Sequence, residues 1–287
     1  MKIIDGKKIA ETIKDGIAQE IFSLNGARPN LAIILANNRP DSKLYVTLKE
    51  KEAKKVGIDT HLYRLEDCVS ENELLGVIDF LNADELIDGI LVQLPLDKTF
   101  NTDKIIAAIN PEKDADGFHP QHPSHIMSPV LAAILKIADD IKLDLAGKKV
   151  CVLYNSEVFG QSLQKLLSSK GAIVSIVPVG NFDSLDETAS QKKYEDIKAV
   201  STEADVLISA LGLPKFIKSD LIKPEAVVID VGITQVGDKV LGDVDFEDVK
   251  DKAGYITPVP GGIGPMTIAL LFRNVLEIYK KKKALGK

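Results

Sequence analysis

The stretch Gly147-Lys-Lys-Val-Cys-Val-Leu-Tyr-Asn-Ser-Glu-Val-Phe-Gly160 decides the fold of this chain. An apolar run comes first, a polar segment follows, and from Gly160 onward apolar residues recur at helical spacing. This order predicts a buried strand, a turn and the start of a helix. Because a second apolar run follows at 172–177, the segment predicts a unit of strand, helix and strand.

The same alternation recurs along the chain. Short apolar runs bounded by Gly, Pro, Asn or Asp predict buried strands at 31–35, 89–92, 149–154, 172–177, 206–209 and 226–231. Amphipathic stretches between them predict helices, for example at 42–56, 71–81, 160–169 and 190–202. Strands that alternate with helices are typical of parallel sheets, so the predicted fold class is α/β.

The length of 287 residues favours two domains over a single core. We expect the boundary in the segment 110–128, which is rich in Pro, His, Asp and Ser and precedes an apolar helix near 130–137. The first domain would span 1–120 and the second 139–265. The C-terminal helix, 266–287, would return to pack on the first domain.

Charge and cysteine content exclude several classes of function. The net charge is −6 and both signs are interspersed, which argues against nucleic acid or an anionic membrane as partner. Two cysteines, Cys68 and Cys151, are too few for a disulfide framework or a thiolate metal site. Without a secretory leader or an apolar run of about 18 residues, we expect a cytoplasmic protein that binds a small molecule.

The segment Thr257-Pro-Val-Pro-Gly-Gly-Ile-Gly-Pro-Met-Thr267 contains three prolines and three glycines in eleven residues. Proline fixes φ, and glycine lets a ligand approach the backbone closely. A helix is predicted from Ile268, so amide groups of this loop would lie at a helix N-terminus and favour carbonyl, carboxylate or phosphate oxygens. A tight turn without a ligand is the simpler alternative.

Three further segments carry candidate catalytic groups. Tyr45 and Lys49 are i,i+4 neighbours on a predicted helix, where an apolar environment would make the lysine available as a proton carrier. Gln93 follows a predicted strand, and its neutral amide could bond a lysine without fixing it as a cation. Solvated lysines on a crowded helix and a structural glutamine are the corresponding alternatives.

The loop 113–118 holds Asp114 and Asp116, of which one is expected to accept hydrogen bonds from N–H groups of a heterocycle. The calcium pattern D-x-[DN]-x-[DN]-G is incomplete, so no metal site is predicted. His119, His122 and His125 follow at intervals of three, but intervening prolines prevent a helix from aligning them, and we expect loop histidines without a ligand.

The turn 154–160 lies where a Rossmann domain binds a pyrophosphate. The signature G-x-G-x-x-G is absent and only Gly160 offers a bare backbone, so a crossover without a nucleotide is the alternative.

Taken in order, the motifs resemble the bifunctional methylenetetrahydrofolate dehydrogenase/methenyltetrahydrofolate cyclohydrolase family over nearly the whole chain. They are Ile3-Ile-Asp-Gly-Lys7, Ser42-x-x-Tyr45-x-x-x-Lys49, Asp88-Gly-Ile-Leu-Val-Gln-Leu-Pro-Leu96, Asp114-x-Asp116-Gly-Phe118, Ala226-Val-Val-Ile-Asp-Val-Gly-Ile233, Gly242-Asp-Val244 and Tyr255-Ile-Thr-Pro-Val-Pro-Gly-Gly-Ile-Gly-Pro-Met-Thr267. Several long motifs in the correct order make this resemblance specific.

The resemblance implies two α/β domains, the second Rossmann-like, with a folate site in the cleft between them. It also implies a homodimer, formed through the nucleotide domain. Lys49 would be the catalytic centre, tuned by Gln93, with Tyr45 stacking on the pterin and Asp116 accepting its hydrogen bonds. Further folate contacts would come from Leu94, Pro260, Gly261 and Gly264, and the contacts to the nicotinamide nucleotide from Tyr154, Asn155, Ser156, Gly160 and Ile233.

This chain departs from the family pattern on the nucleotide side. The usual Gly-Arg-Ser-x-x-Val-Gly-x-Pro is replaced at 154–162, the usual Cys-His-Ser-x-Thr at 177–181, and Pro-Cys-Thr-Pro-x-Gly survives only as Ser128-Pro129. Asn181 and the acidic residues Asp183, Asp186 and Glu187 follow the second predicted strand of this domain. NADP or NAD is therefore the expected cofactor, and a cyclohydrolase without hydride transfer or a non-catalytic folate-binding protein are the alternatives.

Overall fold

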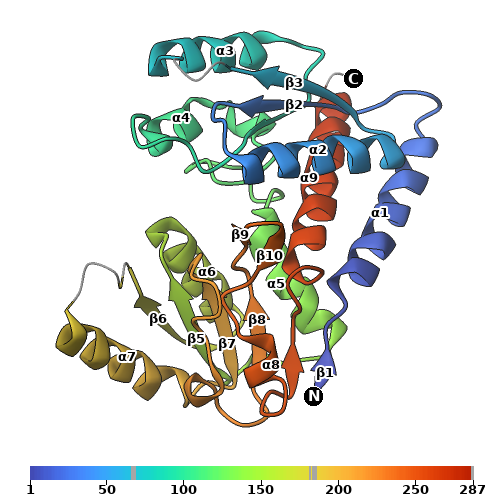
Figure 1. Ribbon diagram of the computed structural model, residues 1–287. Coiled ribbons are helices and arrows are strands. Elements are labelled where there is room, and N and C mark those ends of the chain that lie inside the picture. Colours follow the sequence, from blue (N-terminus) through green and yellow to red (C-terminus); the bar gives the residue numbers. More distant parts are fainter. Residues whose placement is uncertain (66–68, 181, 183–185, 286–287) are drawn as a thin grey trace. The chain divides into compact units, whose positions relative to one another are not determined.

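The computed structural model describes residues 1–65, 69–180, 182 and 186–285, so Cys68, Asn181 and Asp183 lie outside the described residues. The chain folds as two compact units. Unit 1 combines residues 1–8 and 133–266, and unit 2 combines residues 9–132 and 267–287. Each unit has its own parallel sheet (Figure 1), in agreement with the predicted α/β class.

Unit 2 is built on a three-stranded parallel sheet. Its centre is β2 (Asn30–Leu35), flanked by β3 (Asp59–Arg64) and β4 (Gly89–Val92). Successive side chains of a strand point to opposite faces, so Leu31 and Ile33 enter one hydrophobic cluster while Ala32 and Ile34 enter another. The continuous apolar run of β2 is explained by burial on both faces.

Helices cover both faces of this sheet. The helices α1 (Gly6–Phe22), α2 (Pro40–Val56) and α9 (Ile263–Leu285) contribute to the first cluster. The helices α3 (Glu71–Ala83) and α4 (Thr102–Ala108) contribute to the second. Their ends follow local rules: Pro40 begins α2, Gly57 ends it with φ 92°, and Ser70 with Glu73 forms a capping box at the start of α3.

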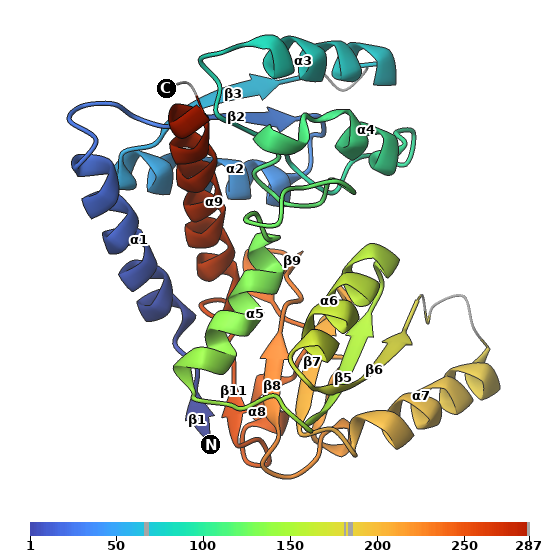
Figure 2. The same cartoon turned by 180° about the vertical axis from the view of Figure 1, so that it is seen from behind.

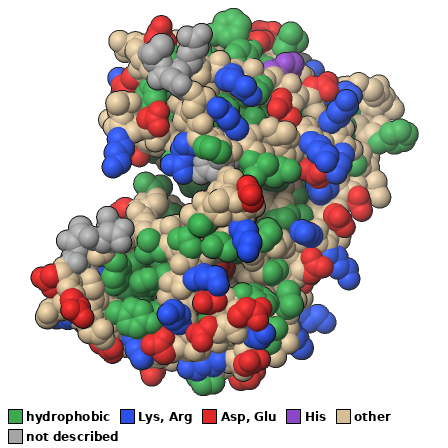
Figure 3. Space-filling model, viewed as in Figure 1, with side chains coloured by type: hydrophobic (Ala, Val, Ile, Leu, Met, Phe, Trp, Pro, Cys, Tyr) green, Lys and Arg blue, Asp and Glu red, His purple; other side chains and the backbone are tan. Residues whose placement is uncertain are grey.

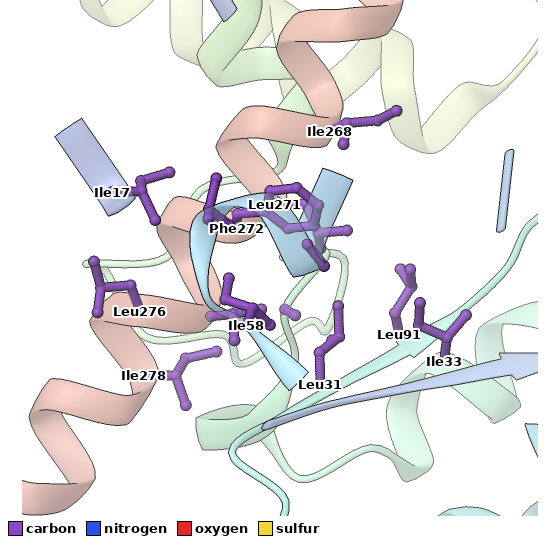
Figure 4. Close-up of a cluster of buried hydrophobic side chains, with 14 of the residues drawn as sticks. Ile17, Leu31, Ile33, Ile58, Leu91, Ile268, Leu271, Phe272, Leu276 and Ile278 are labelled. Carbon is purple, nitrogen blue, oxygen red and sulfur yellow. The ribbon is translucent and has the colours of Figure 1, made fainter. Parts of the chain in front are cut away.

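The C-terminal helix packs in unit 2, as predicted. Ile268, Leu271 and Phe272 lie in the same cluster as Ile17 of α1 and Leu31 of β2 (Figure 4). Phe272 is fully buried. The last helix therefore completes the core of a sheet whose strands precede it by more than half the chain.

Unit 1 contains six parallel strands in the order β1-β11-β8-β7-β5-β6. Their bounds are Lys2–Ile3, Tyr255–Ile256, Val227–Asp230, Val206–Ala210, Lys149–Tyr154 and Ile173–Pro178. The chain runs from β5 outward to β6 and then back past β5 to β7. Such a reversal is the topological switch point of a doubly wound sheet, where ligands bind beyond the carboxyl ends of the strands.

Helices lie on both faces of this sheet as well. Helix α6 (Glu157–Ser169) packs on β5 and β6, on the side turned to the viewer in Figure 2. Helices α7 (Glu187–Ser201) and α8 (Phe246–Val249) pack on the opposite face, where they share a hydrophobic cluster with alternate residues of the central strands. The predicted Rossmann-like architecture of the second domain is confirmed.

The remaining elements are short or connect the sheets. They are the helices α5 (Pro129–Asp140), η1 (Pro111–Lys113) and η2 (Ser219–Leu221), and the antiparallel strands β9 (Thr234–Val236) and β10 (Lys239–Leu241). Within the described part of the chain, no helix is both long and apolar enough to cross a membrane. Figure 3 shows lysine and arginine side chains interspersed with aspartate and glutamate over the visible face.

Two predicted helix starts require correction. Helix α9 begins at Ile263 rather than at Ile268, so the proline- and glycine-rich loop is shorter than expected. Pro265 is tolerated in its first turn because an N–H there has no partner within the helix. Helix α6 begins at Glu157 rather than at Gly160, which leaves only Asn155 and Ser156 between strand and helix.

The core position of Phe272 generates a prediction about stability. Phe272→Ala should lower the free energy of unfolding by about 3–5 kcal/mol, because it removes a large side chain from a fully buried site. Urea titration followed by circular dichroism measures this loss. Phe22→Ala is the control, since Phe22 is 89% exposed and should change stability by less than about 0.5 kcal/mol. Equal effects of both substitutions would contradict the packing described.

Candidate functional site

A lysine and a glutamine meet in unit 2. Lys49 lies on α2 and Gln93 directly follows β4; the Nζ of Lys49 donates to the Oε1 of Gln93 at 2.8 Å. The Nε2 of Gln93 donates to the carbonyl of Leu94 at 2.6 Å, and its backbone N–H donates to Ile34 at 2.9 Å. The amide orientation is therefore fixed, with its oxygen toward the amine.

Asp116 interacts electrostatically with the same lysine. Removal from water raises the pKa of Asp116 from 3.8 to about 6; Lys49 opposes this rise and Asp114 adds to it. Removal from water also lowers the pKa of Lys49, against the opposing charge of Asp116. Both groups are thereby brought closer to a change of protonation state near neutral pH.

The loop that carries Asp116 is shaped by Asp114. The buried carboxylate of Asp114 accepts from the backbone N–H of Asp116 at 3.1 Å and of His119 at 2.7 Å. Gly117 has φ 66°, and a Cβ there would lie 2.7 Å from the backbone nitrogen of Ser128, so only glycine fits. Asp114 is thus occupied with backbone groups, while the carboxylate of Asp116 interacts electrostatically with Lys49.

The three histidines are not gathered at this site. His119 is buried, and its Nδ1 accepts from the backbone N–H of Gln121 at 2.9 Å, whereas His122 and His125 are exposed. Among the described residues there is no group of three or more His, Cys, Asp or Glu side chains that could bind a metal ion.

Tyr45 lies one turn before Lys49 on α2, and both side chains are partly buried. Residues at this spacing share one face of a helix. Unit 2 therefore brings Lys49, Gln93 and Asp116 together and holds Tyr45 on the helical face of Lys49.

The proline- and glycine-rich loop is anchored within unit 1. The backbone N–H of Lys7 donates to the carbonyl of Gly261 at 3.1 Å, and a Cβ on Gly6 would lie 1.9 Å from the carbonyl oxygen of Gly262. Gly261 has φ 115°, and Gly264 lies in the first turn of α9. Close backbone packing therefore accounts for part of the glycine content, in addition to any ligand contact.

Tyr154 ends β5 and is buried against α6. Its hydroxyl donates to the Oε2 of Glu157 at 2.8 Å, and this bond raises the pKa of the phenol. Its ring occupies the space next to Gly160, where a Cβ would lie 2.8 Å from ring carbons. The bare backbone predicted at Gly160 is therefore covered on that side by an aromatic ring of the same chain.

Asn155 connects the carboxyl ends of three strands. Its Nδ2 donates to the carbonyl of Leu211 after β7 at 2.7 Å, and its Oδ1 accepts from the N–H of Gly180 after β6 at 2.6 Å. The next residue, Ser156, is the N-cap of α6 but makes no side-chain capping bond. N–H groups of the first helical turn therefore remain available, which fits a pyrophosphate at this N-terminus.

Asp230 and Asp243 carry two buried carboxylates near Ile233 that were not predicted as functional groups from the sequence. Asp230 accepts from the N–H groups of Gly232 and Val244, both at 2.9 Å, and Asp243 accepts from that of Leu211 at 2.7 Å. Burial, reinforced by Asp243, raises the pKa of Asp230 to about 7. These bonds hold together the loops after β7 and β8, the second of which carries Ile233. The sequence carried two signals for them: Asp230 lies between an apolar run and a glycine, and both aspartates lie in motifs shared with the family.

A doubly wound sheet with an uncapped helix N-terminus in unit 1, and a lysine, glutamine and aspartate set in unit 2, fit the class of two-domain nucleotide-dependent enzymes. Residues 129–283 match the model of the tetrahydrofolate dehydrogenase/cyclohydrolase NAD(P)-binding domain, and residues 4–116 match that of the catalytic domain. The chain belongs to the tetrahydrofolate dehydrogenase/cyclohydrolase family, which confirms the resemblance seen in the sequence.

Individual relatives match this chain over nearly the whole length of both sequences. The bifunctional protein FolD of Aquifex aeolicus is 42% identical over 98% of this chain and 96% of its own. The bifunctional FolD dehydrogenase/cyclohydrolase of Campylobacter jejuni has a similar structure, with TM-score 0.87, 34% identity and coverage of 98% and 99%. The FolD enzyme of Trypanosoma brucei, solved with NADP and an inhibitor, has TM-score 0.88, 31% identity and 97% coverage of both chains.

The raised pKa of Asp116 predicts a pH-dependent stability. Because protonation of this carboxyl favours the folded state, its contribution is full below about pH 4 and is lost as pH rises through about 6. Wild-type protein should therefore gain stability relative to Asp116→Asn when pH falls from 7 to 4. Urea midpoints of both proteins across this range test the expectation, and a difference that does not vary with pH would refute it.

Proposed function

We propose that this chain oxidises 5,10-methylenetetrahydrofolate with NAD(P)+ and hydrolyses the resulting methenyltetrahydrofolate to 10-formyltetrahydrofolate in one-carbon metabolism. Membership of the family supports both activities. The observation that carries the proposal is the bond from Lys49 to Gln93, in an environment that lowers the pKa of the amine.

Lys49 would move the proton in the hydrolytic step. An ordinary lysine, with a pKa of about 10.4, is protonated at neutral pH and accepts no proton, whereas a desolvated one can. The neutral oxygen of Gln93 accepts a hydrogen from either form of the amine and so does not hold it as a cation. Lys49 would accept a proton as water oxygen bonds to the methenyl carbon, and return it to the ring nitrogen when the carbon–nitrogen bond breaks. The remaining hydroxyl proton would leave to solvent as the formyl C=O bond forms, so that hydrolysis of the methenyl cation releases one proton overall.

Within unit 2, the folate would be held by Tyr45 and Asp116, with Leu94 as a further contact. An aromatic ring one helical turn from Lys49 provides a surface on which a flat pterin can stack. Asp116, with a pKa of about 6, can accept or donate a hydrogen bond near neutral pH. On this proposal unit 2 binds folate and unit 1 binds the nucleotide. Residues 1–8, expected in the folate domain of 1–120 with 266–287, belong instead to unit 1, where β1 pairs with β11 in the sheet of the nucleotide domain expected over 139–265.

Tyr154, Asn155, Ser156, Gly160 and Ile233 are the residues we propose to hold the nucleotide. When bound, the nicotinamide supplies the acceptor of a hydride from the one-carbon bridge. The uncapped N-terminus of α6 suits the pyrophosphate, and Asn155 fixes the backbone around it through its bonds to β6 and β7.

We also propose a cytoplasmic homodimer joined through the edge of unit 1. Strand β6 pairs with β5 on one side, and in the described part of the chain no strand covers its other side. Ile173 on this edge is 61% exposed, and unpaired edge strands can pair with a second copy. The buried free thiol of Cys151 fits a reducing compartment.

Two spectrophotometric assays on one preparation test the catalytic proposal: reduction of NADP or NAD with methylenetetrahydrofolate, and hydrolysis of methenyltetrahydrofolate. Lys49→Met should reduce hydrolysis by at least about a hundredfold, within the range of a lost general acid or base. Lys51→Met is the control, because Lys51 lies on the same helix and is exposed.

Unchanged hydrolysis in Lys49→Met would remove this lysine from the mechanism. Hydrolysis by wild-type protein without reduction of either nucleotide would instead support a cyclohydrolase that lacks the redox step. Tight folate binding without turnover of either substrate would support a folate-binding protein.

The proposed dimer predicts the effect of a charge on the edge strand. Ile173→Lys should shift the protein from dimer to monomer, because an ammonium would have to be buried between two edges. Light scattering after size-exclusion chromatography measures the mass. Leu86→Lys, at a residue of unit 2 that is 77% exposed, should leave the mass unchanged. An unaltered dimer in Ile173→Lys would place the interface elsewhere.

A further inference from the structure

A single hydroxyl lies between two buried carboxylates in unit 1. Ser209 of β7 and Asp230 of β8 are partners in the sheet register, and the Oγ of Ser209 donates to the Oδ1 of Asp230 at 3.3 Å. The same hydroxyl makes a side-chain hydrogen bond with Asp243. All three residues are at most 2% exposed, so bulk water does not screen the charges of the two acids.

Two glycines make room for these carboxylates. A Cβ on Gly232 would lie 2.1 Å from the Cγ of Asp243, and a Cβ on Gly242 would lie 2.0 Å from the Oδ2 of Asp230. Only glycine fits at either position, because any Cβ would displace a carboxylate from its hydrogen bonds. The close approach of the two acids is therefore built into the backbone.

Neither acid forms an ion pair within the described part of the chain. Lys215, whose backbone N–H donates to the carbonyl of Gly242 at 3.0 Å, pairs through its ammonium with Asp245 at 3.5 Å instead. Asp243 is thus the charged group that acts on Asp230, and its charge adds to the effect of burial.

The hydrogen atoms available between the two acids require one additional proton. The hydroxyl of Ser209 has one hydrogen, which can be donated to Asp230 or to Asp243 but not to both. With a proton on Asp230, the carboxyl O–H donates to the Oγ of Ser209, and the serine hydrogen is donated to Asp243. Burial, reinforced by Asp243, raises the pKa of Asp230 to about 7, so this proton is bound at slightly acidic pH.

The two acids hold the loops at the carboxyl ends of four strands of unit 1. Asp230 ends β8, and its N–H donates to the Oγ1 of Thr257 after β11 at 2.8 Å. Asp243 accepts from the N–H of Leu211 after β7 at 2.7 Å, and the carbonyl of Leu211 accepts from Asn155 after β5. Ligands of a doubly wound sheet bind at this edge.

We propose that Asp230 and Asp243 share one proton through Ser209 and thereby position the nucleotide-binding loops, so that nucleotide affinity falls when this proton is lost. The inference rests on the proposed nucleotide-binding role of unit 1. Loss of the proton leaves two negative charges on either side of one hydroxyl, and their repulsion loosens the loops after β7 and β8. It also adds a negative charge to the domain that receives an anionic ligand. Asp230 is a positioning residue, because it acts through these loops.

Isothermal titration of the whole protein with NAD and NADP between about pH 6 and pH 9 tests the proposal. The Kd of wild-type protein should rise by about tenfold or more across this range, because the protonated form of Asp230 binds more tightly and is lost above about pH 7. For NADP, the ratio of the Kd values of variant and wild-type protein at each pH removes the titration of the 2′-phosphate.

Asp230→Asn has no titratable proton at this position, so its Kd should change by less than about twofold over the same range. The amide accepts at one oxygen position only, so the absolute affinity falls at every pH and the slope is the decisive quantity. Asp205→Asn is the matched control and should keep the wild-type slope. Asp205 precedes β7 at the opposite end of the strand, and its carboxylate pairs with Lys223 at 2.7 Å.

A second measurement does not depend on a variant of the pair. In protein labelled with ¹³C at its aspartate carboxyl groups, a resonance that titrates near pH 7 should titrate at higher pH once NAD is bound, because the nucleotide favours the protonated pair. Recording the spectra on Asp116→Asn removes the other aspartate whose pKa is raised toward this range.

A wild-type Kd that does not vary with pH, an equal slope in Asp230→Asn, or a resonance that NAD does not move would overturn the proposal. Absence of binding of both nucleotides at every pH would refute the nucleotide-binding role of unit 1, while the carboxyl titration would still decide whether the pair holds a proton.

Discussion

The burial of β2 on both faces is the constraint on which the chemistry of unit 2 depends. A central strand with apolar side chains on both sides fixes its neighbours by backbone bonds alone, and the carbonyl of Ile34 thereby holds the N–H of Gln93. On β4, the carbonyl of Ile90 holds the loop of Asp116 through the N–H of Ala115. Hydrophobic burial thus supplies the precision that the polar groups need, because loops by themselves would not keep an amide and a carboxylate near Lys49.

Both units stabilise their functional loops with buried aspartates. Asp114 in unit 2 and Asp230 and Asp243 in unit 1 accept from backbone N–H groups that have no partner in a helix or strand. Each carboxylate satisfies donors that would otherwise be buried alone, at the cost of its own removal from water. The pKa of Asp230 is raised because burial removes water from its charged form. A loop built in this way keeps one conformation without the packing of a core.

Local sequence patterns predicted those strands and helices whose formation depends on residues close together in the sequence. The apolar runs of β2, β4, β5 and β7 and the helical spacing of Tyr45 and Lys49 were visible in the chain. Strand β3 was missed because its sequence, Asp-Thr-His-Leu-Tyr-Arg, is mixed in polarity and its side chains are only partly buried or exposed. The bonds of Asn155 and of the carboxylate of Asp243 join segments far apart in sequence, so no local rule could reveal them.

The pairing of β1 with β11 has a consequence for how the chain is made. Lys2 is in register with Tyr255, and α9 completes a core begun by α1, so both units combine the earliest and the latest segments of the chain. Unit 1 cannot close before β11 has been synthesised, and unit 2 cannot close before α9 has been synthesised. The nascent chain must therefore keep two sets of apolar strands exposed until these late elements are available, a period in which aggregation competes with folding.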